Sequence, residues 1–209
     1  DLTTYSFSNK PFAGTDKSKI HRVDFSDWQG IQCEAWDWSQ WRAKGDDKAK
    51  KIHQLIAKYP RSEVAFFQKF HESLAKEESL YLGNSLPIRL WDLVSELPRG
   101  FRSNRGANGI DGQVSTALGW MSPGSQNKII LGDLTTLYDF SAFWVTPQLR
   151  KEDIDVELIV VNNGGGKIFS RIFNNEMFEN RHNLNFHPLG EFWGWNHTRL
   201  EDPEAMRPF

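Results

Sequence analysis

Short apolar runs alternate with amphipathic segments and glycine-containing turns over residues 79–161. The runs in "SLYLGNS", "KIILGD" and "DVELIVV" are continuously apolar, as in strands that are buried on both faces. The segments "LPIRLWDLVSEL" and "QVSTALGW" fit helices, and residues 134–149 follow a helical pattern until Pro147. This alternation predicts an α/β fold: a doubly wound, mostly parallel sheet with helices on both faces.

The first 78 residues have a different pattern. Residues 1 to about 30 are polar with little periodicity, and we expect them to be irregular. A helix is predicted from residue 34 to about 57, and a second one over residues 62–78. The apolar stripe of the second helix consists of Val64, Phe67, Phe70 and Leu74. Four tryptophans lie within residues 28–41, and we expect a packing surface there rather than a stacking platform for sugars or bases.

Composition narrows the class of protein. The 209 residues carry 25 basic and 27 acidic side chains, a formal charge of −2, and this balance does not suggest a nucleic-acid partner. No apolar run approaches the roughly 20 residues that cross a bilayer, so no membrane span is expected. The single cysteine, Cys33, excludes an internal disulfide framework. It fits a reducing environment, so the expected location is cytoplasmic.

Polar turns that contain glycine follow the predicted strands. They comprise residues 83–85, 103–112, 132–133 and 162–166. Right-handed crossovers place every strand-to-helix turn at the carboxyl edge of a parallel sheet. Doubly wound proteins bind their ligands at that edge, so the ligand site is predicted there.

Two of these turns contain suitable ligands for a metal ion. Asp133 ends one strand and Asn163 follows a later one, thirty residues on, so the two strands are predicted neighbours. A carboxylate and an amide oxygen then meet, and both are hard donors that suit Mg²⁺. Glycines after Asn163 allow a carbonyl to turn inward and a bulky anion to approach. A helix that begins at residues 134–136 adds free amides for a phosphate.

These glycines also occur in other kinds of turn and phosphate-binding loop. Taken alone, residues 162–164 are typical of a turn. A P-loop requires a glycine five residues before its Gly-Lys pair, and Val161 occupies that position ahead of Gly166-Lys167. The glycines of residues 106–112 do not have the spacing of a dinucleotide-binding fingerprint.

Gly132-Asp133, followed about thirty residues later by Asn-Asn-Gly, resembles the thiamine diphosphate motif of the decarboxylase and transketolase superfamily. The segments "GNSLPIRLWD", "SNRGANGIDGQVSTALG", "GDLTTLYDF" and "LIVVNNGGGKIFS" together resemble the MenD family, the 2-succinyl-5-enolpyruvyl-6-hydroxy-3-cyclohexene-1-carboxylate synthases of menaquinone biosynthesis. The resemblance covers residues 82–173 and, more weakly, the chain to about Met206. Leu134 stands where most of the superfamily has glycine, as in the MenD group. Gly164 stands where close relatives often have a third asparagine.

The resemblance implies roles for individual residues. Asp133, the side chain of Asn163 and the carbonyl of Gly165 would hold Mg²⁺ (or Mn²⁺), which clamps the diphosphate of thiamine diphosphate. The other implied cofactor-binding residues are Asn84, Gly109, Ile110, Leu134, Thr135 and Gly166. The implied substrate-binding residues are Ser85, Arg89, Arg105, Ile168 and Phe169. Ile110 is expected to wedge under the cofactor and bend it.

The implied substrates, 2-oxoglutarate and isochorismate, are both dicarboxylates. Arg89 lies one turn after Ser85 on a predicted helix, so it points back to the carboxyl edge, and Arg105 lies in a glycine loop at that edge. Guanidinium groups suit carboxylates. The implied reaction decarboxylates 2-oxoglutarate and adds the succinyl-semialdehyde carbanion to isochorismate. Another thiamine diphosphate-dependent 2-oxoacid decarboxylase or carboligase, and a non-catalytic assembly domain, are the alternatives.

The resemblance also implies a larger organisation. Residues 1–57 are expected to be the tail of a preceding middle domain and a linker helix. Residues 58–209 are expected to be the diphosphate- and Mg-binding domain, without the family's last strand and helix. The glutamate that activates the cofactor is expected on a separate pyrimidine-binding domain, so no catalytic residue is expected here. We expect a homodimer or homotetramer formed through that domain, and no synthase activity from the 209 residues alone.

Overall fold

The structure is a computed structural model of the whole chain. It describes residues 4–6, 20–22, 37–75, 78–95, 100–104, 109–170, 173 and 175–201. Two compact units divide the chain, Asp1–Gly45 and Asp46–Phe209. Some residues named in the sequence analysis lie outside the described residues: Trp28, Cys33, Trp36 and Arg105.

Within the first unit two short strands pair in parallel. β1 (Thr4–Ser6) lies beside β2 (Ile20–Arg22), with Thr4 opposite Ile20. The prediction of an irregular segment is wrong for these six residues, because three-residue strands are too short to show a period of two.

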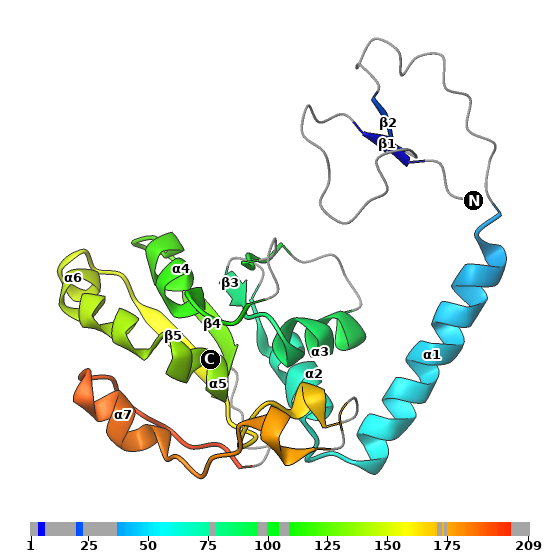
Figure 1. Cartoon of the computed structure of the whole chain (residues 1–209). Coiled ribbons are helices and arrows are strands. Elements are labelled where there is room, and N and C mark those ends of the chain that lie inside the picture. The colour runs from blue at the N-terminus through cyan, green and yellow to red at the C-terminus, as the bar shows by residue number, and fades with distance from the viewer. Residues whose placement is uncertain are drawn as a thin grey trace. The chain divides into compact units, whose positions relative to one another are not determined.

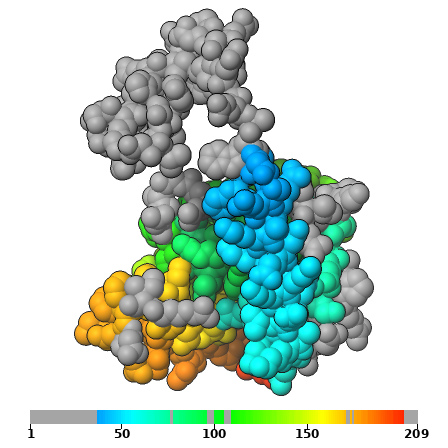
Figure 2. All heavy atoms as spheres, turned by 90° about the vertical axis from the view of Figure 1, so that its right-hand side faces the viewer, coloured from blue at the N-terminus to red at the C-terminus, as the bar shows by residue number. Residues whose placement is uncertain are grey.

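The helix α1 (Ser39–Lys58) carries its side chains at the surface, as the blue-to-cyan helix in Figure 2 shows. None of its residues is buried, and Trp38 and Trp41 are each 58% exposed. Ile52 and Ile56 are half-buried. The sequence pattern lets Trp38, Trp41, Ile52 and Ile56 share one helix face, and this face is only partly covered within the described residues.

A three-stranded parallel sheet forms the centre of the second unit (Figure 1). Its order is β3 (Ser79–Leu82), β4 (Asn127–Gly132) and β5 (Val156–Val161). Leu82 lies opposite Ile130, and the last residues of β4 and β5 lie opposite each other. The α/β class and the parallel sheet are confirmed, and β4 and β5 are neighbours as predicted.

Helices cover both faces of this sheet. α2 (Glu63–Ser73) and α3 (Leu86–Val94) pack on one face, and the buried residues there include Phe67, Phe70, Trp91, Leu80, Leu82 and Ile130. On the other face α4 (Gln113–Trp120) packs with the segment after β4, and the buried residues include Val114, Leu118, Tyr81, Ile129, Leu131 and Phe143. Neighbouring strand residues enter opposite cores, as period-two geometry requires. The apolar burial on both faces stabilises the sheet and places its strand ends.

Several helix boundaries differ from the sequence prediction. α1 begins at Ser39 rather than at residue 34, since residues 37–38 are not helical. α2 ends at Ser73 rather than residue 78, because Leu74 is extended and the N–H of Ala75 donates to Glu78 Oε2 over 2.7 Å. The segment after β4 forms three pieces: α5 (Asp133–Tyr138), η3 (Phe140–Val145) and α6 (Thr146–Lys151). Pro147 lies in the first turn of α6, where its missing N–H costs nothing, so it begins a helix instead of ending one.

The remaining elements follow β5. They are η4 (Lys167–Phe169), η5 (Glu176–Glu179) and α7 (Phe186–Phe192). Among the described helices, none is both long enough and apolar enough to cross a membrane.

Candidate functional site

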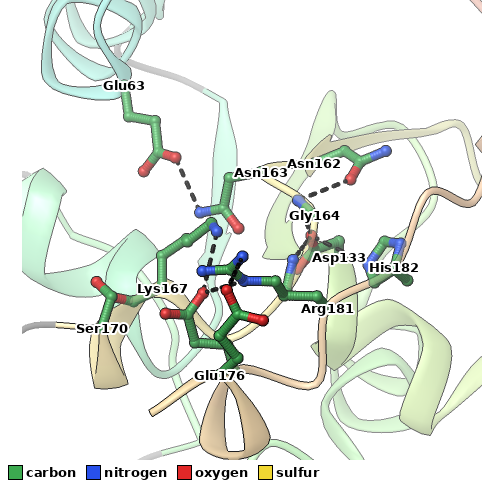
Figure 3. A network of polar contacts seen from close by, with 12 residues as sticks. Glu63, Asp133, Asn162, Asn163, Gly164, Lys167, Ser170, Glu176, Arg181 and His182 are labelled. Atoms are coloured by element: carbon green, nitrogen blue, oxygen red, sulfur yellow. Dashed lines mark hydrogen bonds and ion pairs between the residues drawn. The ribbon is translucent and has the colours of Figure 1, made fainter. Parts of the chain in front are cut away.

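Asp133 joins the carboxyl ends of β4 and β5. Its side chain is buried, and its Oδ1 accepts a hydrogen bond from Leu134 N over 2.7 Å. Its Oδ2 accepts from the N–H groups of Gly164, at 2.8 Å, and Gly165, at 2.9 Å (Figure 3). The aspartate and the glycine run therefore meet at the predicted edge, where parallel register brings the two strand ends together.

The nitrogen and the oxygen of the Asn163 amide differ in their contacts. Its Nδ2 donates to Glu63 Oε1 over 2.8 Å (Figure 3), which points the oxygen away from α2. Its Oδ1 is buried and has no hydrogen bond to any described residue. Buried acceptors normally have a partner, so this oxygen is a candidate ligand atom for a group outside the chain.

The donor set at this edge fits a hard cation. Asp133 supplies a carboxylate, Asn163 an amide oxygen, and Gly165 a backbone carbonyl that accepts one hydrogen bond, from Lys167 N over 2.9 Å. A carbonyl oxygen has two lone pairs, so one of them remains for a cation. These oxygen types are the ones that Mg²⁺ takes while keeping positions for phosphate oxygens and water.

A later segment of the chain covers the glycine run. The Gly166 N–H donates to Glu179 O over 2.5 Å, and the His182 N–H donates to Gly164 O over 3.2 Å. A Cβ on Gly165 would lie 2.5 Å from Glu179 O, and its φ of 138° disfavours any side chain. The steric need for Gly165 therefore comes from residues 179–181, whereas an approaching anion was expected from the sequence. Gly166, an expected cofactor-binding residue, has its N–H bonded to Glu179 O.

Side-chain contacts of Glu179 and His182 hold this covering segment in place. Glu179 is buried, and its Oε2 accepts from Arg181 Nε over 2.9 Å and from Lys167 Nζ over 3.1 Å. The hydrogen bond from Arg181, followed by the one from Lys167, lowers the pKa of Glu179. His182 lies with Nε2 3.2 Å from Oδ2 of Asp133, and its Nδ1 accepts from Leu184 N. The segment thus contacts the aspartate that the sequence analysis identified.

The turn after β3 is held by a buried glutamine. Gln113 Oε1 accepts from the Asn84 N–H over 2.7 Å, and Gln113 Nε2 donates to Gly109 O over 3.0 Å. Asn84 Nδ2 donates to the carbonyls of Asn104, at 3.0 Å, and Gly109, at 2.8 Å. Asn84 Oδ1 is buried with no hydrogen bond to a described residue. Asn84, an expected cofactor-binding residue, therefore presents an acceptor oxygen at this turn.

The predicted substrate-binding residues lie around the same edge, where the structure describes them. Arg89 is exposed, and its Nη1 donates to Ser85 O over 2.6 Å, so it points back along α3 as predicted. Ser85 has φ of 71°, a left-handed conformation that is costly outside glycine. Ile168 is half-buried and Phe169 is 41% exposed, both within η4. Arg105 lies outside the described residues.

Comparison with known proteins identifies the relatives. No protein-family model matches the chain. The chain is 46% identical over 166 residues to a 2-succinyl-5-enolpyruvyl-6-hydroxy-3-cyclohexene-1-carboxylate synthase of Bdellovibrio bacteriovorus. The aligned region covers 76% of this chain and 31% of that synthase. Synthases of the same name from Akkermansia muciniphila and Cronobacter sakazakii are 33% and 38% identical, over 78% and 72% of this chain. The chain is a MenD-family domain.

The matches of this MenD-family domain are partial. It spans about a third of the length of these curated relatives, 31%, 32% and 27% respectively. A solved benzoylformate decarboxylase from Polynucleobacter necessarius superposes with a TM-score of 0.59 at 17% identity, covering 70% of this chain and 29% of that one. This superposition supports the fold alone.

The other predicted residues of the MenD-family domain occupy the same edge. Thr135 is buried in the first turn of α5, Leu134 is half-buried beside it, and Ile110 is half-buried ahead of α4. Sequence reasoning missed Glu63, Gln113 and His182, whose contacts join elements far apart in the chain. Glu63 and its partner Asn163 are 100 positions apart, and no local spacing in the sequence predicts their contact.

Proposed function

We propose that this chain is the diphosphate- and metal-binding domain of a thiamine diphosphate-dependent MenD-type synthase. One observation carries the proposal: Asp133 and the Asn163–Gly165 turn meet at neighbouring strand ends, and the buried Asn163 Oδ1 has no hydrogen-bond partner among the described residues. The similarity to synthases over three quarters of the chain supports this reading over a decarboxylase of another family.

The cofactor site uses oxygen atoms of three residues. Asp133, Asn163 Oδ1 and the Gly165 carbonyl would hold Mg²⁺ or Mn²⁺, whose charge suits a diphosphate. Thiamine diphosphate, when bound, supplies the carbanion-stabilising chemistry of the reaction. Thr135 and Ile110 would contact the cofactor, and the chain would orient it and exclude water.

Around that site, arginines recognise the substrates. Arg89 and Arg105 bind carboxylates of 2-oxoglutarate and isochorismate, because a guanidinium group matches a carboxylate with two parallel hydrogen bonds. Ile168 and Phe169 form an apolar wall beside them. In the overall reaction 2-oxoglutarate loses CO₂ and its succinyl-semialdehyde unit is added to isochorismate, giving 2-succinyl-5-enolpyruvyl-6-hydroxy-3-cyclohexene-1-carboxylate.

The proposed enzyme is larger than this chain. Residues 58–209 supply the diphosphate-binding domain, residues 1–57 belong to a middle domain and linker, and the activating glutamate comes from a pyrimidine-binding domain. That domain also forms the homodimer or homotetramer. Cys33, as the single cysteine, supports a cytoplasmic location.

A product assay tests the proposed function. The complete protein, supplied with thiamine diphosphate, Mg²⁺, 2-oxoglutarate and isochorismate, is expected to release CO₂ and form the succinyl adduct, identified by mass spectrometry. The 209-residue chain alone is expected to form none. Decarboxylation of pyruvate at least as fast as that of 2-oxoglutarate, without adduct formation, would contradict the proposal.

A further inference from the structure

We infer that Glu63 is a positioning residue, which turns the Asn163 amide so that Oδ1 faces the cation position. The inference rests on the proposed function, and it assigns a role to a residue on α2, outside the strand-end turns. Its geometric basis is the 2.8 Å hydrogen bond from Asn163 Nδ2 to Glu63 Oε1 (Figure 3), together with the buried Asn163 Oδ1, which makes no hydrogen bond within the described part of the chain.

The start of α2 is anchored well enough for this role. Ser62 caps the helix by accepting a hydrogen bond from Ala65 N over 3.3 Å. One turn later Phe67 and then Phe70 are fully buried against the sheet, in the same cluster as Leu82 and Ile130. Glu63 therefore extends from a backbone that is fixed relative to the strands, and its side chain is held close to the end of β5.

The chemistry of the amide explains why a carboxylate is suited to the task. An asparagine side chain has a donor end and an acceptor end, and only the oxygen end binds a cation. A carboxylate accepts hydrogen bonds and does not donate them, so Glu63 binds the Nδ2 end and repels a flipped oxygen. Without Glu63 the amide is free to rotate and to present its NH₂ group to the cation. Partners of metal ligands that set such orientations typically change metal affinity by 10–100-fold when removed.

Mn²⁺ binding to the complete protein tests this role independently of turnover. Free and bound Mn²⁺ are measured by electron paramagnetic resonance at saturating thiamine diphosphate. Glu63→Ala is expected to weaken Mn²⁺ binding by about 10-fold or more. Glu63→Gln retains an acceptor for Asn163 Nδ2 and is expected to bind nearly as the unchanged protein does. The matched control is Glu72→Ala, an exposed glutamate on the same helix, which should change nothing.

A double-mutant cycle separates orientation from stability. If Glu63 acts through the amide, Glu63→Ala adds little to the loss already caused by Asn163→Ala. Equal Mn²⁺ affinity in Glu63→Ala and the unchanged protein, or a loss in Glu63→Gln as large as that in Glu63→Ala, would overturn the inference. Mn²⁺ that does not bind to the unchanged protein even with thiamine diphosphate would instead refute the proposed function.

Discussion

Gly165 and Asp133 are 32 positions apart in the chain, yet the Gly165 N–H donates to Asp133 Oδ2 over 2.9 Å. The Gly164 N–H reaches the same oxygen, so one carboxylate ties the end of β5 to the end of β4. Asp133 therefore has a structural role as well as its proposed role as a metal ligand. A variant at this position is expected to affect stability and metal binding together.

Removal of the Asp133 carboxylate should destabilise the chain even without cofactor. Asp133→Ala leaves the buried N–H of Gly165 without an acceptor, which costs about 1–3 kcal/mol, whereas the N–H of Gly164 keeps its 3.3 Å hydrogen bond to Asn162 Oδ1. Urea unfolding of the chain measures the loss, with Asp92→Ala, an exposed aspartate on α3, as the control. Equal stability of the two variants would show that the carboxylate does not join the strand ends.

Gly165→Ala should lower the free energy of unfolding by about 1–3 kcal/mol, because the new Cβ would meet Glu179 O and the backbone is left-handed. Gly119→Ala is the matched comparison: Gly119 lies in α4 with open space around it, and alanine favours a helix interior by about 1 kcal/mol. Thermal unfolding of the two variants should therefore shift in opposite directions. A Gly165→Ala protein as stable as the unchanged chain would mean that residues 179–182 do not cover the glycine run.

The ion pairs of Glu179 predict a pH dependence. Arg181 and Lys167 lower the pKa of Glu179 in the folded chain, so its ionised form adds stability above the unfolded pKa, near 4.5, and that stability is lost as the pH falls through the lowered value. Glu179→Gln should be less stable than the unchanged chain at neutral pH. The difference should shrink as the pH falls below about 4.5, measured by urea unfolding at several pH values. A difference that stays constant down to pH 3 would rule out the ionised carboxylate as its source.

Arg89 should matter for substrates that carry carboxylates. In the complete protein, Arg89→Ala is expected to lower kcat/KM for the synthase reaction about 100-fold, while thiamine diphosphate binding is retained. Arg199→Ala removes an exposed arginine of the C-terminal segment and serves as the comparison. An Arg89→Ala enzyme that matches Arg199→Ala in kcat/KM would remove Arg89 from the substrate site.

The sequence predicted the parts of the site that depend on strand order and strand ends. Apolar runs located β3, β4 and β5, and the spacing of Asp133 and Asn163 predicted neighbouring strands whose ends meet, as they do. The register of a parallel sheet then brings both turns to one edge, so local pattern and topology suffice for this much.

Contacts between distant elements could not be predicted from the sequence when they depend on the direction of a side chain. The bond between Glu63 and Asn163 depends on how α2 packs against the sheet, and no period in the chain encodes it. The cover by residues 179–182 was missed for the same reason, since its backbone bonds to Gly164 and Gly166 involve no recognisable side-chain motif. The prediction that a helix ends at Pro147 was wrong, because proline interrupts a helix interior but is well suited to the first turn of a helix, where Pro147 lies.

Calorimetric titration of the complete protein with thiamine diphosphate tests the central claim most directly. With Mg²⁺ present, saturable binding is expected, and a chelator that removes the metal should abolish it. Asn163→Ala, which deletes the buried oxygen that has no partner in the described part of the chain, should weaken binding by about 10-fold or more. Binding of equal strength with and without Mg²⁺, and in Asn163→Ala, would contradict a cofactor held through a metal at this sheet edge.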